Sequence, residues 1–379
     1  MRKIKLMTLL GTRPEIIRLS AVIKKCDQYF DQILVHTGQN YDYTLNGIFF
    51  KDLDLRAPDY YLDAVGADLG ETIGNIIAKS YRLMQELQPD ALLVLGDTNS
   101  CLAAISAKRL HIPIFHMEAG NRCFDECLPE ETNRRIVDHI ADVNLCYSEH
   151  ARRYLNAEGV ARERTYVTGS PMAEVLRANL PAIERSDVLQ RLGLAPRYYI
   201  LLSAHREENI DTDENFQALF NSVNALARKY DLPILYSCHP RSRKRLEQMN
   251  FVLDERVQLH EPLGFHDYNN LQMNAYCVVS DSGTLPEESA FFAGAGHPFP
   301  AVCIRTSTER PEAMEKGCFI LAGITPGGVE QAVQTAVELQ ENGDFGLPVP
   351  DYTEDVSVKV VKLIQSYVGV VNTMVWRKR

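Results

Sequence analysis

Residues 91–120, with the sequence ALLVLGDTNSCLAAISAKRLHIPIFHMEAG, contain two short apolar runs separated by a longer segment. The runs at 91–95 and 114–117 have the length and composition of buried strands, and residues 100–110 have the pattern of an amphipathic helix. Strand, helix and strand in this order predict a βαβ unit, whose two strands lie parallel in one sheet.

The same alternation continues on both sides of this stretch. Further strand-like runs lie at 4–10, 33–36, 143–146, 199–203, 234–237, 277–280 and 301–304, and further helical segments at 72–86, 130–141 and 357–367. Residues 169–197 are polar, contain Pro and Arg, and interrupt the alternation. We therefore expect an α/β protein with two Rossmann-like domains, at 1–172 and 173–358. Residues 359–379 should form a C-terminal helix that packs back on the first domain.

The composition suits two globular domains in a chain of 379 residues, 45% of them apolar. A net charge of −10 disfavours nucleic acid or an anionic membrane as a partner, because both attract positively charged proteins. The first residues lack the apolar region of a signal peptide, and no apolar stretch is long enough for a membrane span. Nine scattered cysteines and the absence of metal-ligand spacing predict reduced thiols, a cytoplasmic protein and no metal site.

Polar clusters follow the predicted strands almost without exception. The clusters lie at 11–15, 96–99 and 118–120 in the first half, and at 205–209, 239–241 and 281–284 in the second half. Ligands of open α/β sheets bind at the carboxyl ends of the strands. We therefore expect both sheets to face one central cleft that these clusters line.

Residues 11–15 follow the first predicted strand and open a helix, and they lack the GxGxxG pattern of a dinucleotide site. The amides at a helix start favour an anion, and Arg13 can add a bidentate phosphate contact. The alternative is a plain strand-to-helix turn with Pro14 at the first helical position.

Residues 281–288 have the same placement in the second half. Ser282 and the amides from Gly283 onward can form a phosphate nest, and the Glu288 carboxylate can accept both hydroxyls of a ribose. The alternative is helix capping, with acids in the first turn.

Three acids of the first half are candidates for acid–base chemistry. Asp97 and Glu118 end predicted strands, and Glu131 begins a predicted helix. Partial burial of an acid at a strand end raises its pKa toward the range that is useful for proton transfer. The alternatives are an N-cap for Asp97 and stabilisation of the helix dipole for Glu131.

Cationic side chains follow the strands of the second half. His205 and Arg206 can face a diphosphate or donate to a leaving oxygen, and His239 has the same placement one strand later. Arg310 lies near a further turn. The alternatives are a structural histidine and surface ion pairs.

Together these motifs resemble the non-hydrolysing UDP-N-acetylglucosamine 2-epimerase family. They are Gly-Thr-Arg-Pro-Glu (11–15), Gly-Asp-Thr (96–98), His-Met-Glu-Ala-Gly (116–120), Pro-Glu-Glu-Thr-Asn-Arg (129–134), Asp-Ser-Gly (281–283) and Thr-Glu-Arg-Pro-Glu (308–312). The resemblance implies a GT-B fold and an epimerisation at C2 through a 2-acetamidoglycal, with no cofactor or metal. It implies acid–base roles for Asp97, Glu118, Glu131 and His205, and contacts to UDP from Arg13, Arg206, Ser282 and Glu288. We also expect contacts to the substrate from four further residues, which are Arg18, His239, Gly283 and Arg310.

Some positions depart from the common family pattern. Arg18 stands where Lys is frequent, and Thr284 stands where a second Gly is frequent. Residues 11–20, 123–129, 281–289 and 305–312 look similar to a branch of capsule and O-antigen enzymes. That branch converts UDP-2-acetamido-2,6-dideoxy-L-talose to UDP-N-acetyl-L-fucosamine.

Other functions remain open at this point. They are a UDP-GlcNAc/UDP-ManNAc 2-epimerase, a GT-B glycosyltransferase and a UDP-sugar-binding sensor whose acids only bind hydroxyl groups. We expect a UDP-amino sugar as ligand and a homodimer as the assembly.

Overall fold

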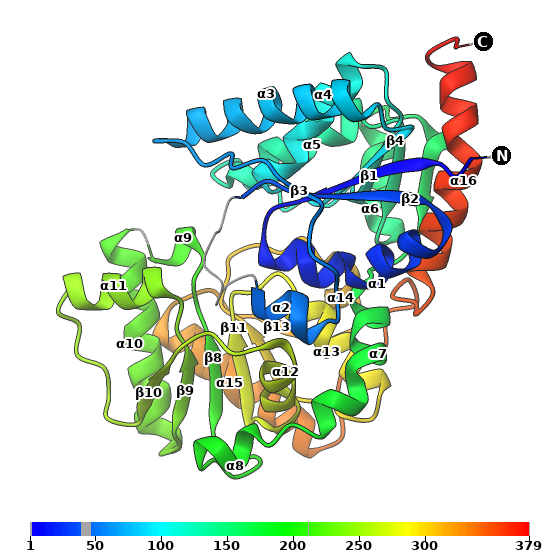
Figure 1. Cartoon of the computed structure of the whole chain (residues 1–379). Coiled ribbons are helices and arrows are strands. Elements are labelled where there is room, and N and C mark those ends of the chain that lie inside the picture. The colour runs from blue at the N-terminus through cyan, green and yellow to red at the C-terminus, as the bar shows by residue number, and fades with distance from the viewer. Residues whose placement is uncertain (1, 39–46, 211, 379) are drawn as a thin grey trace. The chain divides into compact units, whose positions relative to one another are not determined.

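The structure is a computed structural model that describes residues 2–38, 47–210 and 212–378. The chain forms two compact units (Figure 1). The first unit comprises Met1–Arg177 and Asp351–Arg379, and the second unit comprises Ala178–Pro350. Each unit contains one parallel sheet, so the predicted α/β class with two parallel sheets is confirmed.

The sheet of the first unit has seven strands in the order β3-β2-β1-β4-β5-β6-β7. Its strands are β1 (Lys5–Leu10), β2 (Asp31–His36), β3 (Tyr60–Tyr61), β4 (Ala91–Leu95), β5 (Ile114–Ala119), β6 (Val143–Cys146) and β7 (Thr165–Val167). Its helices are α1 (Arg13–Tyr29), α2 (Gly47–Asp52), α3 (Leu69–Leu87), η1 (Asn99–Leu102), α4 (Ala103–Arg109), α5 (Pro129–Ile140), α6 (Glu149–Ala157), η2 (Arg162–Arg164) and α16 (Val356–Met374). The order reverses between β1 and β4, which is where open α/β sheets bind ligands.

The core of the first unit lies between the sheet and helices α3, α4 and α5, which Figure 1 shows together on one face of the sheet. Met7 and Leu92 of the sheet pack in one cluster with Ile76 of α3, Ala104 of α4 and Val137 of α5. On α5 the buried positions recur at helical spacing, so one face of the helix is fixed against the sheet. The C-terminal helix α16 packs against α1.

The sheet of the second unit has six strands in the order β10-β9-β8-β11-β12-β13. Its strands are β8 (Ile200–Ser203), β9 (Ile234–Ser237), β10 (Val257–His260), β11 (Cys277–Ser280), β12 (Ala301–Cys303) and β13 (Ile320–Leu321). Its helices are α8 (Val188–Leu192), α9 (Glu207–Ile210), α10 (Asp213–Tyr230), α11 (Pro240–Gln248), α12 (Phe265–Asn274), α13 (Leu285–Gly294), α14 (Pro311–Glu315) and α15 (Pro326–Glu341). Helices α10 and α15 pack on one face of this sheet around Phe216, Phe220 and Val333.

Four strands were not predicted from the sequence, and each lies at an edge of a sheet. They are β3, β7, β10 and β13. Edge strands are partly exposed and short, so they need no continuous apolar run: β3 and β13 have only two residues each. Residues 169–197, which interrupt the alternation in the sequence, contain two helices, α7 (Met172–Glu184) and α8. The boundary between the two units lies within α7.

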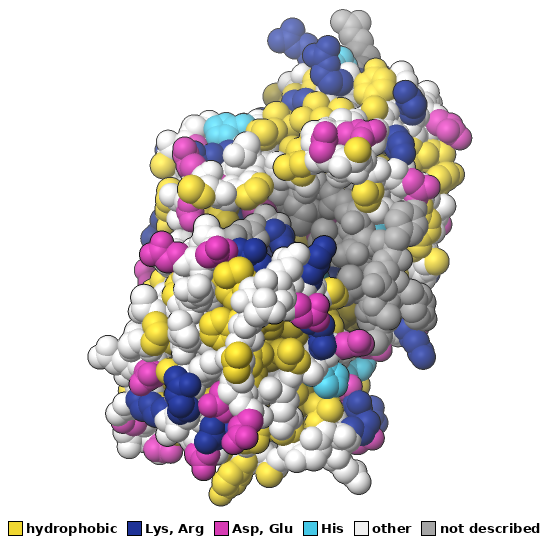
Figure 2. All heavy atoms as spheres, turned by 90° about the vertical axis from the view of Figure 1, so that its left-hand side faces the viewer, with side chains coloured by type: hydrophobic (Ala, Val, Ile, Leu, Met, Phe, Trp, Pro, Cys, Tyr) yellow, Lys and Arg dark blue, Asp and Glu magenta, His cyan; other side chains and the backbone are white. Residues whose placement is uncertain are grey.

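The surface of the molecule carries side chains of both charges. On the face shown in Figure 2, Lys and Arg side chains are interspersed with Asp and Glu side chains. Within residues 2–38, 47–210 and 212–378, no helix combines the length and the apolar character that a membrane span needs. The nine cysteines are free thiols, and only Cys127 is exposed.

Candidate active site

The three candidate acids lie at one edge of the first unit's sheet. Asp97 follows β4 by two residues, Glu118 is next to last in β5, and Glu131 is in the first turn of α5. Strands β4 and β5 pair in parallel, so their carboxyl ends lie side by side. The parallel register thus brings Asp97 and Glu118 to the same edge of the sheet.

Glu118 has an unusual backbone conformation. Its φ is +65°, and the pairing of β5 with β6 shifts register between Met117 and Ala119. Such an irregularity redirects a side chain and is typical of functional sites. The carboxylate is nearly buried, with Oε2 2.6 Å from Nη1 of Arg18, and Oε1 accepts a hydrogen bond from Nδ2 of Asn121 at 3.1 Å.

Gly96 allows this carboxylate to lie against the loop after β4. A Cβ atom at Gly96 would lie 3.1 Å from Oε2 of Glu118, and the φ of Gly96 is +73°. Both the space and the backbone conformation therefore favour glycine at this position. Because Asp97 follows directly, Glu118 lies close to the backbone that carries Asp97.

Arg134 connects the other two acids. Its Nη2 lies 2.5 Å from Oδ2 of Asp97, and its Nη1 lies 3.1 Å from Oε2 of Glu131. Arg135 donates to the second oxygen of Glu131 at 3.1 Å. Glu131, Arg134 and Arg135 are three and four positions apart on α5, the spacing at which helical side chains meet.

We call Asp97, Glu118 and Glu131 the acid cluster. Glu118 and Glu131 are only 5% and 1% exposed, so each ionised carboxylate needs a positive partner, and Arg18 and Arg134 supply one. Cys123 also contacts Glu131: its amide and its Sγ each lie 3.3 Å from Oε2. The cluster can hold and transfer protons at neighbouring positions of one ligand.

In the second unit, Asp281 organises the loop that follows β8. Its side chain is fully buried, and Oδ2 accepts hydrogen bonds from the amides of His205 and Arg206 at 2.9 Å and from Nδ2 of Asn209 at 3.1 Å. Strands β8 and β11 pair in parallel, so Asp281 lies beside the end of β8. One buried carboxylate thereby fixes the backbone of residues 205–209.

The two candidate histidines differ in their contacts. Nδ1 of His205 lies 3.3 Å from Oδ1 of Asp281, so the carboxylate orients the imidazole. Nδ1 of His239 accepts a hydrogen bond from the amide of Arg241 at 3.3 Å, which makes His239 the N-cap of α11. The ring centroids of His205 and His239 are 6.1 Å apart.

Residues 282–288 form a turn and then the first turn of α13. Oγ of Ser282 accepts from the amide of Thr284 at 3.3 Å and lies 2.9 Å from Oγ1 of Thr284. Thr284 is the N-cap residue of α13, but no side-chain hydrogen bond caps the helix. Glu288 is 5% exposed, and its Oε2 accepts from Nε2 of Gln272 at 2.7 Å. Gly283 lies within the turn.

Arg310 and Arg13 were both predicted to contact the substrate, and in the structure each interacts with another side chain of the protein. Arg310 is 2% exposed, and its Nη2 lies 3.3 Å from Oε2 of Glu287. The guanidinium of Arg13, the first residue of α1, lies 5.6 Å from the ring centroid of Phe49. Arg310 is therefore part of an internal ion pair of the second unit, and Arg13 is placed at a helix start in the first.

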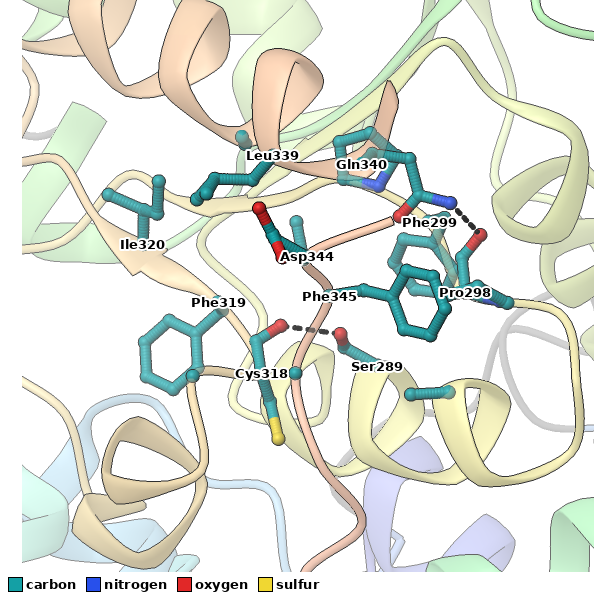
Figure 3. Close-up of a pocket in the computed structure, with 16 residues that line it drawn as sticks. Ser289, Pro298, Phe299, Cys318, Phe319, Ile320, Leu339, Gln340, Asp344 and Phe345 are labelled. Carbon is teal, nitrogen blue, oxygen red and sulfur yellow. Dashed lines mark hydrogen bonds between the residues drawn. The ribbon is translucent and has the colours of Figure 1, made fainter. Parts of the chain in front are cut away.

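A hollow elsewhere in the second unit is separate from these residues. It has a volume of about 400 Å³, including space that is open to solvent, and is lined by residues of α13, α15, β12, β13 and the segment around Phe345 (Figure 3). Ser289 donates to the carbonyl of Cys318, and Gln340 donates to the carbonyl of Pro298 at 3.0 Å. None of the predicted site residues lines this hollow.

The sequence pattern of one family, described as UDP-N-acetylglucosamine 2-epimerase, matches residues 24–364, which is most of the chain. The chain belongs to this family. It is accordingly an enzyme of the isomerase class, a UDP-sugar 2-epimerase.

Solved structures of this epimerase family have the same fold. A UDP-N-acetylglucosamine 2-epimerase from Rickettsia bellii is 46% identical, with 100% of both chains covered and a TM-score of 0.91. The UDP-GlcNAc 2-epimerase of Methanocaldococcus jannaschii, in complex with UDP-GlcNAc and UDP, is 30% identical. It covers 96% of this chain and 99% of its own, with a TM-score of 0.88.

A curated relative carries another substrate in its name. It is the UDP-2,3-diacetamido-2,3-dideoxy-D-glucuronate 2-epimerase of Pseudomonas aeruginosa, 31% identical over 347 residues that cover 90% of this chain and 95% of the relative. Members of the epimerase family therefore differ in the sugar that they are named for.

Some groups of this epimerase's candidate site were not selected from the sequence. Arg134 could have been found, because it lies one helical turn after Glu131 on the predicted helix. Asp281 directly follows a strand, but its contacts to the loop after β8 join residues more than seventy positions apart. Only the fold reveals such a contact.

Proposed function

We propose that this 2-epimerase converts UDP-2-acetamido-2,6-dideoxy-L-talose to UDP-N-acetyl-L-fucosamine by eliminating and re-adding UDP. One observation carries the chemistry: Arg134 joins Asp97 and Glu131, and Glu118 lies against the backbone beside Asp97. Epimerisation at C2 must serve both faces of that carbon, which requires more than one proton-transfer group.

The reaction balances without an added reagent. A carboxylate of the acid cluster takes the C2 proton, the C2–H electron pair forms the C1–C2 double bond, and the C1–O bond breaks with its electrons going to UDP. UDP then attacks C1 of the 2-acetamidoglycal, and C2 receives a proton on the opposite face. We assign these proton transfers to Asp97, Glu118 and Glu131.

The second unit supplies most of the nucleotide contacts in this proposal, and Arg13 of the first unit adds one. The helix start after Ser282 and the guanidinium of Arg206 stabilise the diphosphate, whose charge grows as it leaves. The buried carboxylate of Glu288 accepts hydroxyl groups of the ribose. His205, which Asp281 orients, donates to the leaving oxygen or takes part in proton transfer. Arg13, Arg18, His239, Gly283 and Arg310 complete the substrate contacts that we assign.

The choice of sugar rests on the similarity of four segments to the branch that makes UDP-N-acetyl-L-fucosamine. Segment 123–129 carries Cys123, which contacts Glu131, and segment 281–289 carries Ser282 and Glu288. The segments that resemble the branch thus contain or touch the residues of the proposed reaction. For this enzyme we further propose a cytoplasmic role in capsule or O-antigen synthesis and a homodimeric assembly.

UDP-GlcNAc and UDP-ManNAc form the second candidate substrate pair. Its support is the name of the 46% identical protein from Rickettsia bellii. The two candidates differ at the sugar's configuration and at C6, where one carries a methyl group and the other a hydroxymethyl group.

Incubation in deuterated water separates these possibilities. We expect deuterium to enter C2 of the substrate without any acceptor, and kcat/KM to be higher for UDP-2-acetamido-2,6-dideoxy-L-talose than for UDP-GlcNAc. A preference for UDP-GlcNAc would favour the second candidate. No exchange at C2 with either sugar would contradict the proposed reaction.

A further inference from the structure

A buried ion pair joins the two strand ends that carry Asp97 and Glu118. His116 lies in β5 and is fully buried. Its Nε2 lies 2.8 Å from the carbonyl oxygen of Gly96, and its Nδ1 lies 2.9 Å from Oδ1 of Asp138. The imidazole therefore connects the residue before Asp97 with helix α5.

Asp138 extends this connection to the end of β5. It is fully buried on α5, and its carboxylate accepts the amide of Gly120 at 3.1 and 3.2 Å. Nη1 of Arg122 donates to Oδ2 of Asp138 at 2.7 Å. A single carboxylate thus fixes the backbone two residues after Glu118.

A carboxylate and a carbonyl oxygen hold the imidazole of His116 from two sides. Burial opposes a charge on His116, but the contacts with Asp138 and with the carbonyl of Gly96 outweigh it and raise the pKa of the imidazole. The imidazole thus lies between a carboxylate and a carbonyl oxygen, and both favour its charged form. The other charged groups that act on the pair are Arg122, which also binds Glu158 at 2.7 Å, and Asp97. Positive and negative groups alternate, so the buried charges are compensated.

Glu118 needs such support. A positive φ is strained in a residue other than glycine, and it persists only where the surroundings determine it. Only glycine fits at position 120, because a Cβ atom there would lie 2.4 Å from the carbonyl oxygen of Ala151. The anchored amide of Gly120 thus limits the conformations that Glu118 can take.

We infer that His116 and Asp138 are positioning residues that hold the carboxylates of Asp97 and Glu118 in the arrangement required for proton transfer at C2. They act through the carbonyl of Gly96 and the amide of Gly120, and neither contacts the substrate. This inference rests on the proposed function of the acid cluster.

The chain offers a matched control for Asp138. Asp142 is also buried, at 4% exposure, and its Oδ2 accepts the amide of Ile114 at 3.0 Å, at the opposite end of β5. Its Oδ1 accepts from Lys108 at 2.7 Å. Asp138→Asn and Asp142→Asn therefore each remove a buried carboxylate that accepts a backbone amide beside β5, at its carboxyl end and its amino end respectively.

The test compares both variants by kcat for C2 exchange, by UDP affinity and by thermal melting. Asp138→Asn should lower kcat by about 10²-fold, the effect of displacing catalytic groups by about 1 Å, and leave UDP affinity unchanged. Asp142→Asn should lower the melting temperature and leave kcat unchanged. Should Asp138→Asn fail to fold, His116→Gln, which removes the imidazole and keeps a hydrogen-bond donor, replaces it with the same expected result.

The outcomes distinguish this inference from the proposed function. If Asp138→Asn and Asp142→Asn changed kcat equally, the positioning role would be overturned. A wild-type kcat in His116→Gln would also overturn it. In either case the wild-type protein would still exchange the C2 proton. Absence of C2 exchange in the wild-type protein would instead contradict the proposed function itself.

Discussion

The first unit gathers its candidate acids in ion pairs with arginines, whereas the second unit presents backbone amides and hydroxyl groups beside charged side chains such as Arg206 and Glu288. The acid cluster depends on Arg18 and Arg134, whose guanidinium groups lie 2.5–3.1 Å from the three carboxylates. In the second unit, Asp281 turns inward and holds the amides of His205 and Arg206. We propose that the first region transfers protons and that the second binds the diphosphate.

The difference suggests how the reaction divides between the two units. Proton transfer requires groups that titrate, and it is sensitive to small displacements. Binding of a diphosphate by amides and a helix start does not depend on one titrating group. Substitutions in the acid cluster should therefore affect turnover, and substitutions in residues 282–288 should affect affinity.

The largest effect is expected in the acid cluster. Asp97→Asn, Glu118→Gln and Glu131→Gln keep the shape of each side chain and remove its titrating group, so each should lower turnover by about 10²–10⁴-fold. Calorimetry should show that UDP affinity is retained in all three. A purely structural role predicts instead a lower melting temperature with near-normal turnover of the folded protein.

A smaller effect is expected in the nucleotide-binding residues. Ser282→Ala and Glu288→Ala should each raise the Kd for UDP by roughly tenfold, the loss of one charge-assisted contact. Thr284→Gly serves as the control in the same turn, and it should bind UDP like the wild type. Unchanged affinity in both variants, measured by calorimetry, would remove this assignment.

Glu15 is a buried carboxylate whose hydrogen-bond donors are neutral groups. A comparison with Glu15 therefore shows what the arginine partners contribute to the acid cluster. Its Oε2 accepts from the amide of Gly11 at 3.0 Å and from Oγ1 of Thr12 at 2.8 Å. Burial raises the pKa of Glu15 from 4.5 to about 7, since these hydrogen bonds only partly offset the loss of solvation. The unfolded chain then loses this proton at lower pH than the folded chain, so stability falls as pH rises from 4.5 to about 7.

Glu15→Gln does not titrate and should escape this loss. The melting temperature of Glu15→Gln minus that of the wild type should increase by a few degrees between pH 5 and pH 7. Each kcal/mol of stability corresponds to roughly 2–4 °C. Glu71→Gln is the matched baseline: Glu71 is exposed, lies in the first turn of α3, and accepts the amide of Ala67 at 2.6 Å. A difference for Glu15→Gln that stays constant with pH would show that burial does not control this carboxylate.

The smallest effect concerns Cys123. Its thiol donates to Oε2 of Glu131, so Cys123→Ala should lower turnover by several-fold, at most about tenfold for one hydrogen bond of roughly 1 kcal/mol. Cys127→Ala is the control, because Cys127 is exposed and its described hydrogen bond comes from its amide, which donates to Asp125. Equal turnover of both variants would mean that the thiol contact does not tune Glu131.

The sequence predicts the centre of each sheet better than its edges. Strands such as β4 and β11 are buried along their whole length and appear as continuous apolar runs. Strands β3 and β10 are partly or fully exposed, and their residues show no such run. Their pairing depends on the neighbouring strand, which a local pattern does not contain.

The same limit applies to the site. The positions of Asp97 and Glu118 at strand ends follow from parallel topology, which the sequence indicates. The ion pair between Arg18 and Glu118 joins residues 100 positions apart, so the sequence pattern alone offered Arg18 only as a substrate contact. The contact of His116 with Asp138 likewise depends on how α5 packs against β5, which a local sequence pattern does not show.

We propose that the first unit transfers the C2 proton while the second unit binds most of UDP. Deuterium entry at C2, measured at saturating UDP-sugar, distinguishes these two roles. We expect near wild-type exchange in Ser282→Ala, because saturation compensates for weaker binding, and exchange at least about 10²-fold slower in one or more acid-cluster variants. Wild-type exchange in Asp97→Asn, Glu118→Gln and Glu131→Gln alike would contradict this division of roles.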